Sequence, residues 1–222
     1  MEIVGFSVCH QLDSRSLIFG ETVNPICSRC AGIYIGFVVA AVILFIMFRK
    51  KQSELPPLYI MIILAVFFIS TIIDGLSSYL GLYETNNIIR FTSGTLCGAA
   101  IIAVLYPVFN FQYYRKPSRK RIFARPFTFI IFCLILAAFI IFSLLRPSWL
   151  GSFYYYFSGV SVILTFFFVS LTMIFLIPGF SQKAGRLFTR HLVIPSILAL
   201  LLTALELFIA YSMHRLMDRF AG

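Results

Sequence analysis

Three thiols and one imidazole lie ahead of the first long apolar segment of the chain: Cys9, His10, Cys27 and Cys30. The chain has 5 cysteines and 3 histidines, so half of these side chains fall within its first 30 residues. Structural zinc is held by four tetrahedral ligands, often three Cys and one His, with one pair at Cys-x-x-Cys spacing. Cys27 and Cys30 have this spacing. The segment therefore predicts a zinc site, with Cys9 and His10 as the other two ligands.

The adjacent residues Cys9 and His10 decide whether this site is closed or open. Both can bind one metal ion only if the backbone turns sharply between them. If only one of them binds, water or a carboxylate takes the fourth place, and a zinc site with an open position can be catalytic.

The same cysteines also have a redox interpretation. Cys27 and Cys30 have the spacing of a thiol–disulfide exchange pair, for which Cys9 would be the resolving thiol. Such a protein would be an oxidoreductase coupled to a membrane quinone. A structural disulfide is a further alternative, because the outside of a cell can be oxidising.

The residues Asn24-Pro25 predict where the first membrane helix begins. Asn is a good helix cap, and Pro is tolerated at the first helical position. A helix starting at Pro25 would place Cys27 and Cys30 on one face of its first turns. The electropositive helix start and the nearby Arg29 both favour the thiolate form of these cysteines.

The composition places the chain in a lipid bilayer. It is 60% hydrophobic and 12% charged, and its mean hydropathy is +0.97. Soluble domains have about 25% charged residues, and a helix needs about 20 apolar residues to cross a membrane. We therefore expect an all-α, multi-pass protein of the cell membrane, a single domain over 1–222 with a Cys/His segment at 1–31 and a six-helix bundle at 32–213. The expected spanning segments are 32–48, 58–82, 91–109, 126–145, 153–177 and 192–213.

The distribution of basic residues predicts the orientation of the bundle. Lys and Arg gather in cytoplasmic loops. The first, third and fifth connections hold 12 of the 18 basic residues: Arg49, Lys50, Lys51, Arg115, Lys116, Arg119, Lys120, Arg121, Arg125, Lys183, Arg186 and Arg190. Both termini, and the Cys/His segment, are then extracytoplasmic.

The net charge of +10 fits this topology and attraction to anionic lipids, and no nucleic-acid module accompanies it. The lipid bilayer is the expected partner, and the sequence leaves the oligomeric state open.

Polar residues at the level of the cysteines complete the candidate site. Asp74 and Arg90 are the catalytic candidates, Asp74 as a base or metal ligand and Arg90 as the group that holds an anion. An intramembrane acid usually faces a bundle interior or a wet cavity. The structural alternative for Asp74 is an ion pair, for example with Arg90.

The candidates for binding a substrate are Arg15, Arg29, Asn86, Asn87 and Glu206. Arg15 and Arg29 have an alternative role as solvated interface charges, and Glu206 has one as the partner of a basic residue.

Two pairs of glycines predict a close helix contact. Gly32 and Gly36 in the first membrane segment, and Gly94 and Gly98 in the third, have the small-residue spacing that lets two helices approach closely. We expect these pairs to join the first and third helices within the bundle rather than to form a dimer.

Two blocks of the sequence resemble a family of prokaryotic membrane proteins. The first block is Cys9-His10-Gln11 with Arg15-Ser16, followed by Pro25-x-Cys27-x-Arg29-Cys30-x-Gly32-Ile33-Tyr34-x-Gly36. The second is Asp74-Gly75 with Asn86-Asn87-x-x-Arg90-x-x-x-Gly94. They are similar to the family catalogued as domain of unknown function 2085. The resemblance implies a multi-helix membrane protein in which Asp74, Asn86, Asn87 and Arg90 form one site with the cysteines, and it implies no established activity.

Three functions follow as hypotheses. The first is a zinc site beside a polar pocket, in an enzyme or binder of a lipid-linked or small anionic molecule. The second is the quinone-coupled thiol–disulfide oxidoreductase. The third is a small-molecule transporter or its substrate-binding subunit. The sequence argues against transport, because it shows no pair of inverted halves such as many transporters have.

Overall fold

Six helices long enough to cross a membrane form the body of the protein. A computed structural model describes residues 1–11, 13–48, 52–81, 85–185 and 189–221, without the side chains of 13, 79 and 218–221. In this part of the chain the spanning helices are α2 (Ser28–Met47), α3 (Leu58–Tyr79), α4 (Asn87–Tyr113), α5 (Pro126–Leu144), α6 (Gly151–Leu176) and α7 (Val193–Ala221). Helices satisfy their own backbone hydrogen bonds, which lipid cannot do. The prediction of an all-α protein with six membrane helices is confirmed.

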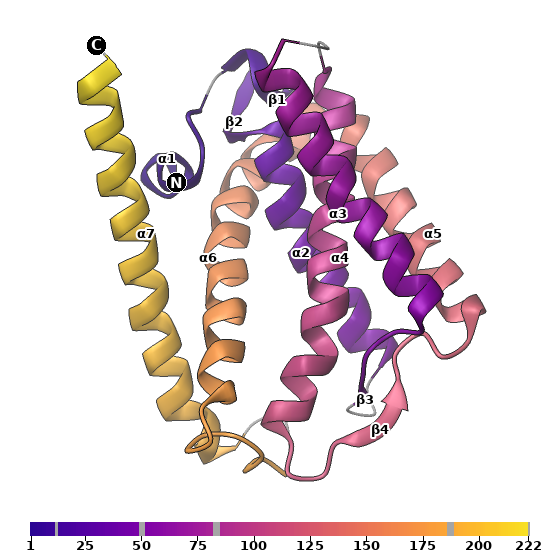
Figure 1. Cartoon of the computed structure of the whole chain (residues 1–222). Helices are drawn as coiled ribbons and strands as arrows, with labels where there is room; N and C mark the ends of the chain where they lie inside the picture. Colours follow the sequence, from indigo (N-terminus) through magenta and orange to yellow (C-terminus); the bar gives the residue numbers. More distant parts are fainter. Residues whose placement is uncertain (12, 49–51, 82–84, 186–188, 222) are drawn as a thin grey trace.

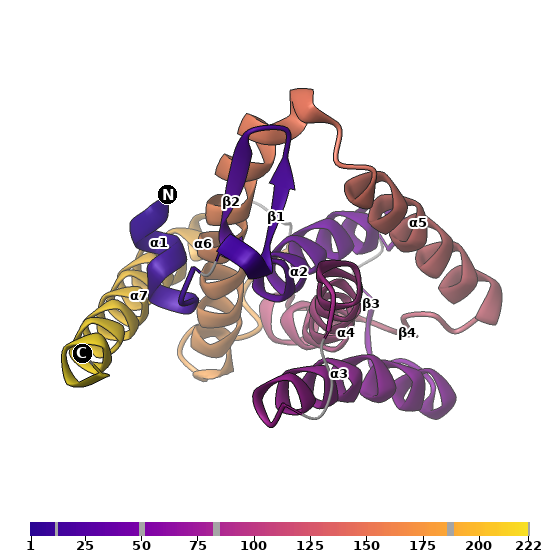
Figure 2. The same cartoon turned by 90° about the horizontal axis from the view of Figure 1, so that it is seen from above.

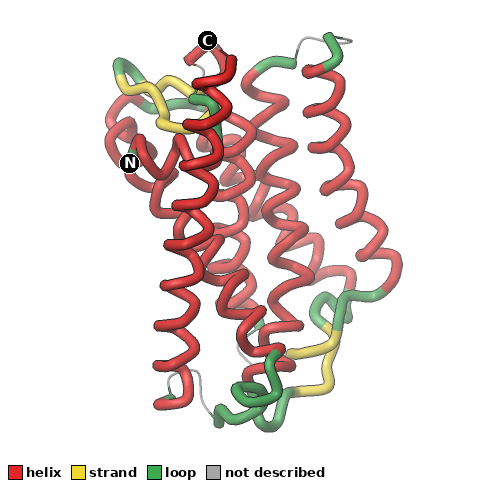
Figure 3. Tube along the Cα trace, turned by 60° about the vertical axis from the view of Figure 1, so that its left-hand side comes forward, coloured by secondary structure: helices red, strands yellow, loops and turns green. Residues whose placement is uncertain are grey.

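The spanning helices run side by side, with their ends at two levels (Figures 1 and 3). Helix α4 is the most buried of them and α7 the least. Seen from above, α2 and α4 lie in the middle, with α7 and α5 at opposite edges (Figure 2). The site residues carried by α2 and α4 are therefore held by the interior of the bundle.

Each end of the bundle carries a small two-stranded sheet. At one end, which we call the hairpin end, β1 (Ser16–Phe19) pairs antiparallel with β2 (Thr22–Cys27). The short helix α1 (Glu2–Val8) lies between this hairpin and α7 (Figures 1 and 2). At the other, the basic end, β3 (Gln52–Glu54) pairs parallel with β4 (Ser118–Arg121). Both termini lie toward the hairpin end. The basic residues at 49–51 and Arg186 lie outside the described residues, as does 82–84 of the second connection.

The predicted start of the first membrane helix at Pro25 is wrong. Asn24 and Pro25 belong to strand β2, and the helix begins at Ser28, with Cys27 as its cap residue. The reason is a tertiary contact that the local pattern does not contain. The Asn24 side chain is buried, and its Oδ1 accepts a hydrogen bond of 2.6 Å from the Ser158 hydroxyl of α6, far along the chain. Such contacts routinely override local helix signals.

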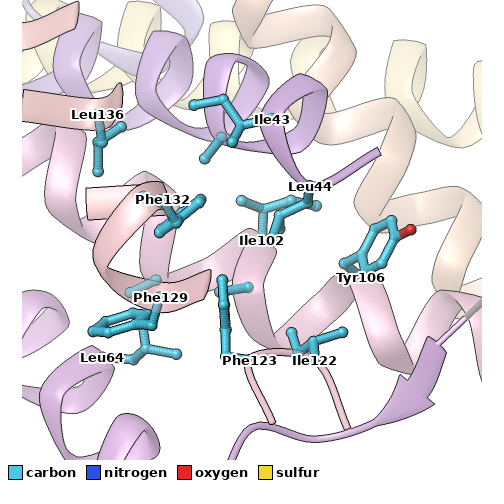
Figure 4. Packing of buried hydrophobic residues seen from close by; sticks show 14 of the residues in the cluster. Ile43, Leu44, Leu64, Ile102, Tyr106, Ile122, Phe123, Phe129, Phe132 and Leu136 are labelled. Carbon is cyan, nitrogen blue, oxygen red and sulfur yellow. The ribbon is translucent and has the colours of Figure 1, made fainter. Parts of the chain in front are cut away.

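A cluster of apolar side chains fixes α2, α4 and α5 near the basic end. Figure 4 shows Ile43 of α2, Ile102 of α4 and Phe132 of α5 turned toward one another. Ile102 and Phe132 are fully buried. This packing anchors one end of α2 and α4, whose other ends carry the candidate site.

The glycine pairs bring α2 and α4 into backbone contact, as predicted. A Cβ atom placed on Gly32 would lie 3.1 Å from Cα of Gly94, and one on Gly36 would lie 2.7 Å from Cα of Thr95. A Cβ on Gly98 would collide with the carbonyl of Ile33. These glycines therefore set the distance between the two helices that carry the site.

We expect Gly36→Ala to destabilise the fold by about 1–3 kcal/mol, the usual cost of overpacking a well-packed interior. The added methyl group would lie 2.7 Å from Cα and the carbonyl oxygen of Thr95, and these backbone atoms cannot move aside as the end of a flexible side chain can. Thermal unfolding in detergent measures the effect. Gly179→Ala is the control, because nothing lies within 4 Å of a Cβ at that position. Equal melting temperatures for the two variants would contradict the close packing of α2 and α4.

Candidate metal centre

The three N-terminal cysteines come together at the hairpin end. Their Sγ atoms all lie within 4.8 Å of one another, and Cys9 is buried. Four sulfur or nitrogen ligands at about 2.0–2.3 Å from a tetrahedral zinc ion lie about 3.3–3.8 Å apart. A closure of an ångström or less would therefore bring these sulfurs into one coordination sphere.

Local structure explains how residues distant in sequence meet. Cys27 ends β2 and caps α2, and Cys30 lies in the first turn of the helix. Cys9 follows α1 and reaches back, so that the Cys27 amide donates a hydrogen bond to its Sγ at 3.3 Å. The Gln11 side-chain amide holds this fold-back in place, since its Nε2 donates to the carbonyls of Glu2 (2.9 Å) and Pro25 (2.8 Å). Sequence reasoning gave Gln11 no role beyond its place in the family signature.

Cys9 is the most acidic thiol of the group. Hydrogen bonds from the thiols of Cys27 and Cys30 lower the pKa of Cys9 to about 2, against the opposing effect of burial. The Cys30 thiol also acts to lower the pKa of Cys27, but the neighbouring Cys9 sulfur and burial outweigh it and raise that pKa. Cys9 therefore loses its proton more readily than Cys27, and binding of a cation would release the protons of the other thiols.

His10 does not join the three sulfurs. Its side chain is exposed, and its ring lies edge-on to His214 of α7, with the ring centroids 4.7 Å apart. Backbone geometry gives the reason. Cys9 is extended (φ −155°, ψ 141°), and successive side chains of an extended chain point to opposite sides. In the part of the chain that the structure describes, the group of potential ligands is three cysteines, without the predicted imidazole.

Asp74 forms a structural ion pair, as the alternative interpretation expected, but its partner is Arg29 and not Arg90. Arg29 Nε donates to Asp74 Oδ2 at 2.8 Å, and Nη2 contacts the same oxygen and the Asp74 carbonyl. Arg29 is therefore not a solvated interface charge. Asp74 is only 7% exposed, and its second oxygen, Oδ1, is buried with no hydrogen-bond partner among the described residues.

Arg90 is a buried guanidinium held by neutral groups. Its Nε donates to the Thr85 hydroxyl at 2.6 Å, and Nη2 donates to the Ser78 hydroxyl at 3.3 Å. No ion pair involving Arg90 occurs in the described ranges. Arg15, Arg29 and Asp74 all lie within electrostatic range of it. Arg15, Arg29 and Arg90 bring three positive charges to this region and Asp74 brings one negative charge, so positive charge is in excess around Arg90.

The two asparagines have structural partners. Asn86 caps α4, since its Oδ1 accepts the Ile89 amide at 2.8 Å. Asn87 donates from Nδ2 to the carbonyls of Ser16 (3.1 Å) and Ser14 (3.4 Å), which ties α4 to the hairpin. Both residues therefore fix the first turn of α4, which carries Arg90.

Arg15 lies at the same end of the bundle as the cysteines, whereas Glu206 lies near the middle of the bundle. The Arg15 side chain is exposed at the hairpin end, and its carbonyl accepts a hydrogen bond from the Ser28 hydroxyl at 2.9 Å. Glu206 accepts one from Ser170 at 3.2 Å, roughly 28 Å along α6 from its first residue. The expectation that Glu206 joins the level of the cysteines is wrong, because α7 continues to Ala221 and leaves Glu206 near its middle.

Tyr34 is a neighbour of the cluster that had no predicted role beyond its place in the family signature. It lies one helical turn after Cys30 and within electrostatic range of all three sulfurs. The i, i+4 spacing from Cys30 was the signal that could have identified it.

Comparisons with known proteins place this site within a family. Residues 9–105 match the family model described as "Predicted membrane protein (DUF2085)", a region that holds the three cysteines, Arg29, Asp74 and Arg90. The chain is 32% identical over 110 residues to the "Uncharacterized protein MJ1492" of Methanocaldococcus jannaschii, covering 49% of this chain and 68% of the relative. It is 33% identical over 101 residues to an "Uncharacterized protein" of Methanothermobacter thermautotrophicus, covering 46% of this chain and 86% of the relative. No solved structure matches. With this agreement over its N-terminal half, the chain belongs to the DUF2085 family of predicted membrane proteins.

Proposed function

We propose that this membrane protein binds zinc through Cys9, Cys27 and Cys30, and uses the site together with Arg90 to bind and act on a small or lipid-linked anionic molecule. The observation that carries the proposal is the approach of the three sulfurs to within 4.8 Å of one another. Thiolates select soft metals, and zinc is the common choice for Cys-rich sites. Three protein ligands with a fourth position left for water or substrate are typical of catalytic zinc sites.

The polar residues around Arg90 support an anionic ligand. Arg90 is held by two hydroxyl groups and has donors to spare, since a guanidinium carries five N–H groups. Arg29 and Arg15 add positive charge, and the free Oδ1 of Asp74 is available to accept a proton. Zinc, when bound, would polarise an oxygen atom or lower the pKa of water. Arg90 would hold the anion, and Asp74 would serve as the base. The Lys and Arg distribution predicts that this end faces the outside.

The proposal is tested by the metal content of protein purified without a chelator. We expect about one zinc ion per chain, with the three thiols protected from alkylation until the metal is removed. Metal-free protein with three reactive thiols would contradict it.

Thiol–disulfide exchange is the second candidate function, and the same approach of the sulfurs favours it. Oxidation of Cys27 and Cys30 to a disulfide would release two electrons and two protons, which a quinone would accept to become a quinol. Protein isolated without zinc, whose Cys27–Cys30 pair cycles between oxidised and reduced forms, would support this function over the first.

The anion site gives a separate prediction. We expect phosphate to raise the melting temperature of the wild-type protein, because a ligand that binds only the folded state stabilises it. Arg90→Gln should abolish this shift, whereas Arg146→Gln, a change of the same type in the connection before α6, should leave it intact. Loss of the shift in both variants would contradict a specific role of Arg90.

A further inference from the structure

The basic end of the bundle holds a cavity with a polar wall, far from the cysteines. Its volume is about 660 Å³, and it lies between the end of α2, strand β4 and the start of α5. The cationic side chains that line it are Lys120, Arg121 and Arg125. The proposed zinc function uses none of these residues.

Positive charge in this cavity is largely uncompensated. Glu54 is paired with Arg121 at 3.6 Å, but both side chains are well exposed, so the pair is weak. Lys120 and Arg125 have no ion-pair partner in the part of the chain that the structure covers. The cavity therefore has room for one or more negative charges.

The start of α5 also favours an anion in this cavity. Arg125 is the cap residue of the helix, with no side-chain hydrogen bond to the first turn, and Thr128 of that turn also lines the cavity. The first turn of a helix is electropositive and favours anions such as phosphate. It supplements the three cationic side chains.

The remaining wall is apolar. Ile46, Met47 and Phe48, at the end of α2, line the same cavity, and Ile46 is 60% exposed. A free phosphate ion would gain nothing from these side chains. An amphiphile would fit both walls, with its anionic group on the cations and the start of its chain on the apolar residues. The cavity also lies where two spanning helices end, the depth at which lipid headgroups are found.

We propose that this cavity binds the headgroup of an anionic phospholipid. Lys120, Arg121 and Arg125 hold the phosphate, and the end of α2 contacts the glycerol and the first part of the acyl chains. Basic pockets at the ends of membrane helices bind anionic headgroups in this way. The bound lipid would join α2 to α5, which pack together near this end.

Native mass spectrometry of the detergent-solubilised protein tests the proposal. We expect phosphatidylglycerol to bind more tightly than phosphatidylcholine. Lys120→Gln/Arg125→Gln should weaken phosphatidylglycerol binding about 25-fold, at about fivefold for each basic residue. Lys116→Gln/Arg119→Gln removes the same charge from the same connection outside the cavity, and should change binding by less than about twofold.

Three outcomes would overturn the proposal. Equal weakening in the two double variants would indicate general surface attraction. If the wild-type protein bound phosphatidylcholine as tightly as phosphatidylglycerol, the cavity would have no preference for an anionic headgroup. Displacement of the lipid by millimolar inorganic phosphate would assign the cavity to a free anion.

Discussion

Cys27→Ser is expected to remove zinc from the purified protein, whereas Cys133→Ser is expected to leave it in place. Cys27 provides one of the three sulfurs that lie within 4.8 Å of one another, and Cys133 lies apart from them in α5. Loss of an outer-shell partner already weakens metal binding about 10–100-fold, so loss of a ligand should cost at least about 100-fold. Metal analysis and titration with a competing chelator measure the difference.

The outcome of this pair of variants is decisive for the role of the cysteines. Zinc retained in Cys27→Ser, or lost equally in Cys133→Ser, would contradict the three-sulfur site. Cys9→Ser and Cys30→Ser should behave as Cys27→Ser does, because the proposal gives the three sulfurs equivalent roles.

Asp74→Asn is expected to destabilise the protein by about 3 kcal/mol, toward the low end of the cost of breaking a buried ion pair. The substitution leaves the Arg29 charge without a partner, close to Arg90. The value lies at the low end because the Arg29 side chain is 22% exposed and keeps some contact with solvent. Unfolding in detergent, followed by thermal or denaturant titration, gives the free-energy change.

A second ion pair in the same chain provides the control. Glu54→Gln breaks the exposed pair with Arg121, which should cost about 0–1 kcal/mol. The double variant Arg29→Gln/Asp74→Asn should recover part of the loss, since it removes both charges. If Asp74→Asn were no more harmful than Glu54→Gln, the Arg29–Asp74 pair would not hold α2 to α3.

The parts of the fold that depend on local patterns were predictable from the sequence. Long apolar segments located the six membrane helices, and small residues located the contact between α2 and α4. The spacing of Cys27 and Cys30 located the cluster. Hydropathy and spacing suffice for these features because the signal for each is contained in short segments.

The features that depend on tertiary contacts were not predictable. Asn24 carries a good helix-cap signal, yet its contact with Ser158 of α6 keeps it in a strand. The sequence placed two arginines near the level of Asp74, and the packing of both α2 and α3 against α4 is what brings Arg29 to it. His10 is next to a ligand candidate in sequence, but the extended backbone at Cys9 turns it away. No pattern in a single segment contains these contacts.

X-ray absorption at the zinc edge tests the metal site most directly. We expect three sulfur atoms at about 2.3 Å from zinc and one nitrogen or oxygen atom at about 2.0 Å. A zinc ion with only nitrogen and oxygen neighbours, and no sulfur shell at about 2.3 Å, would contradict it.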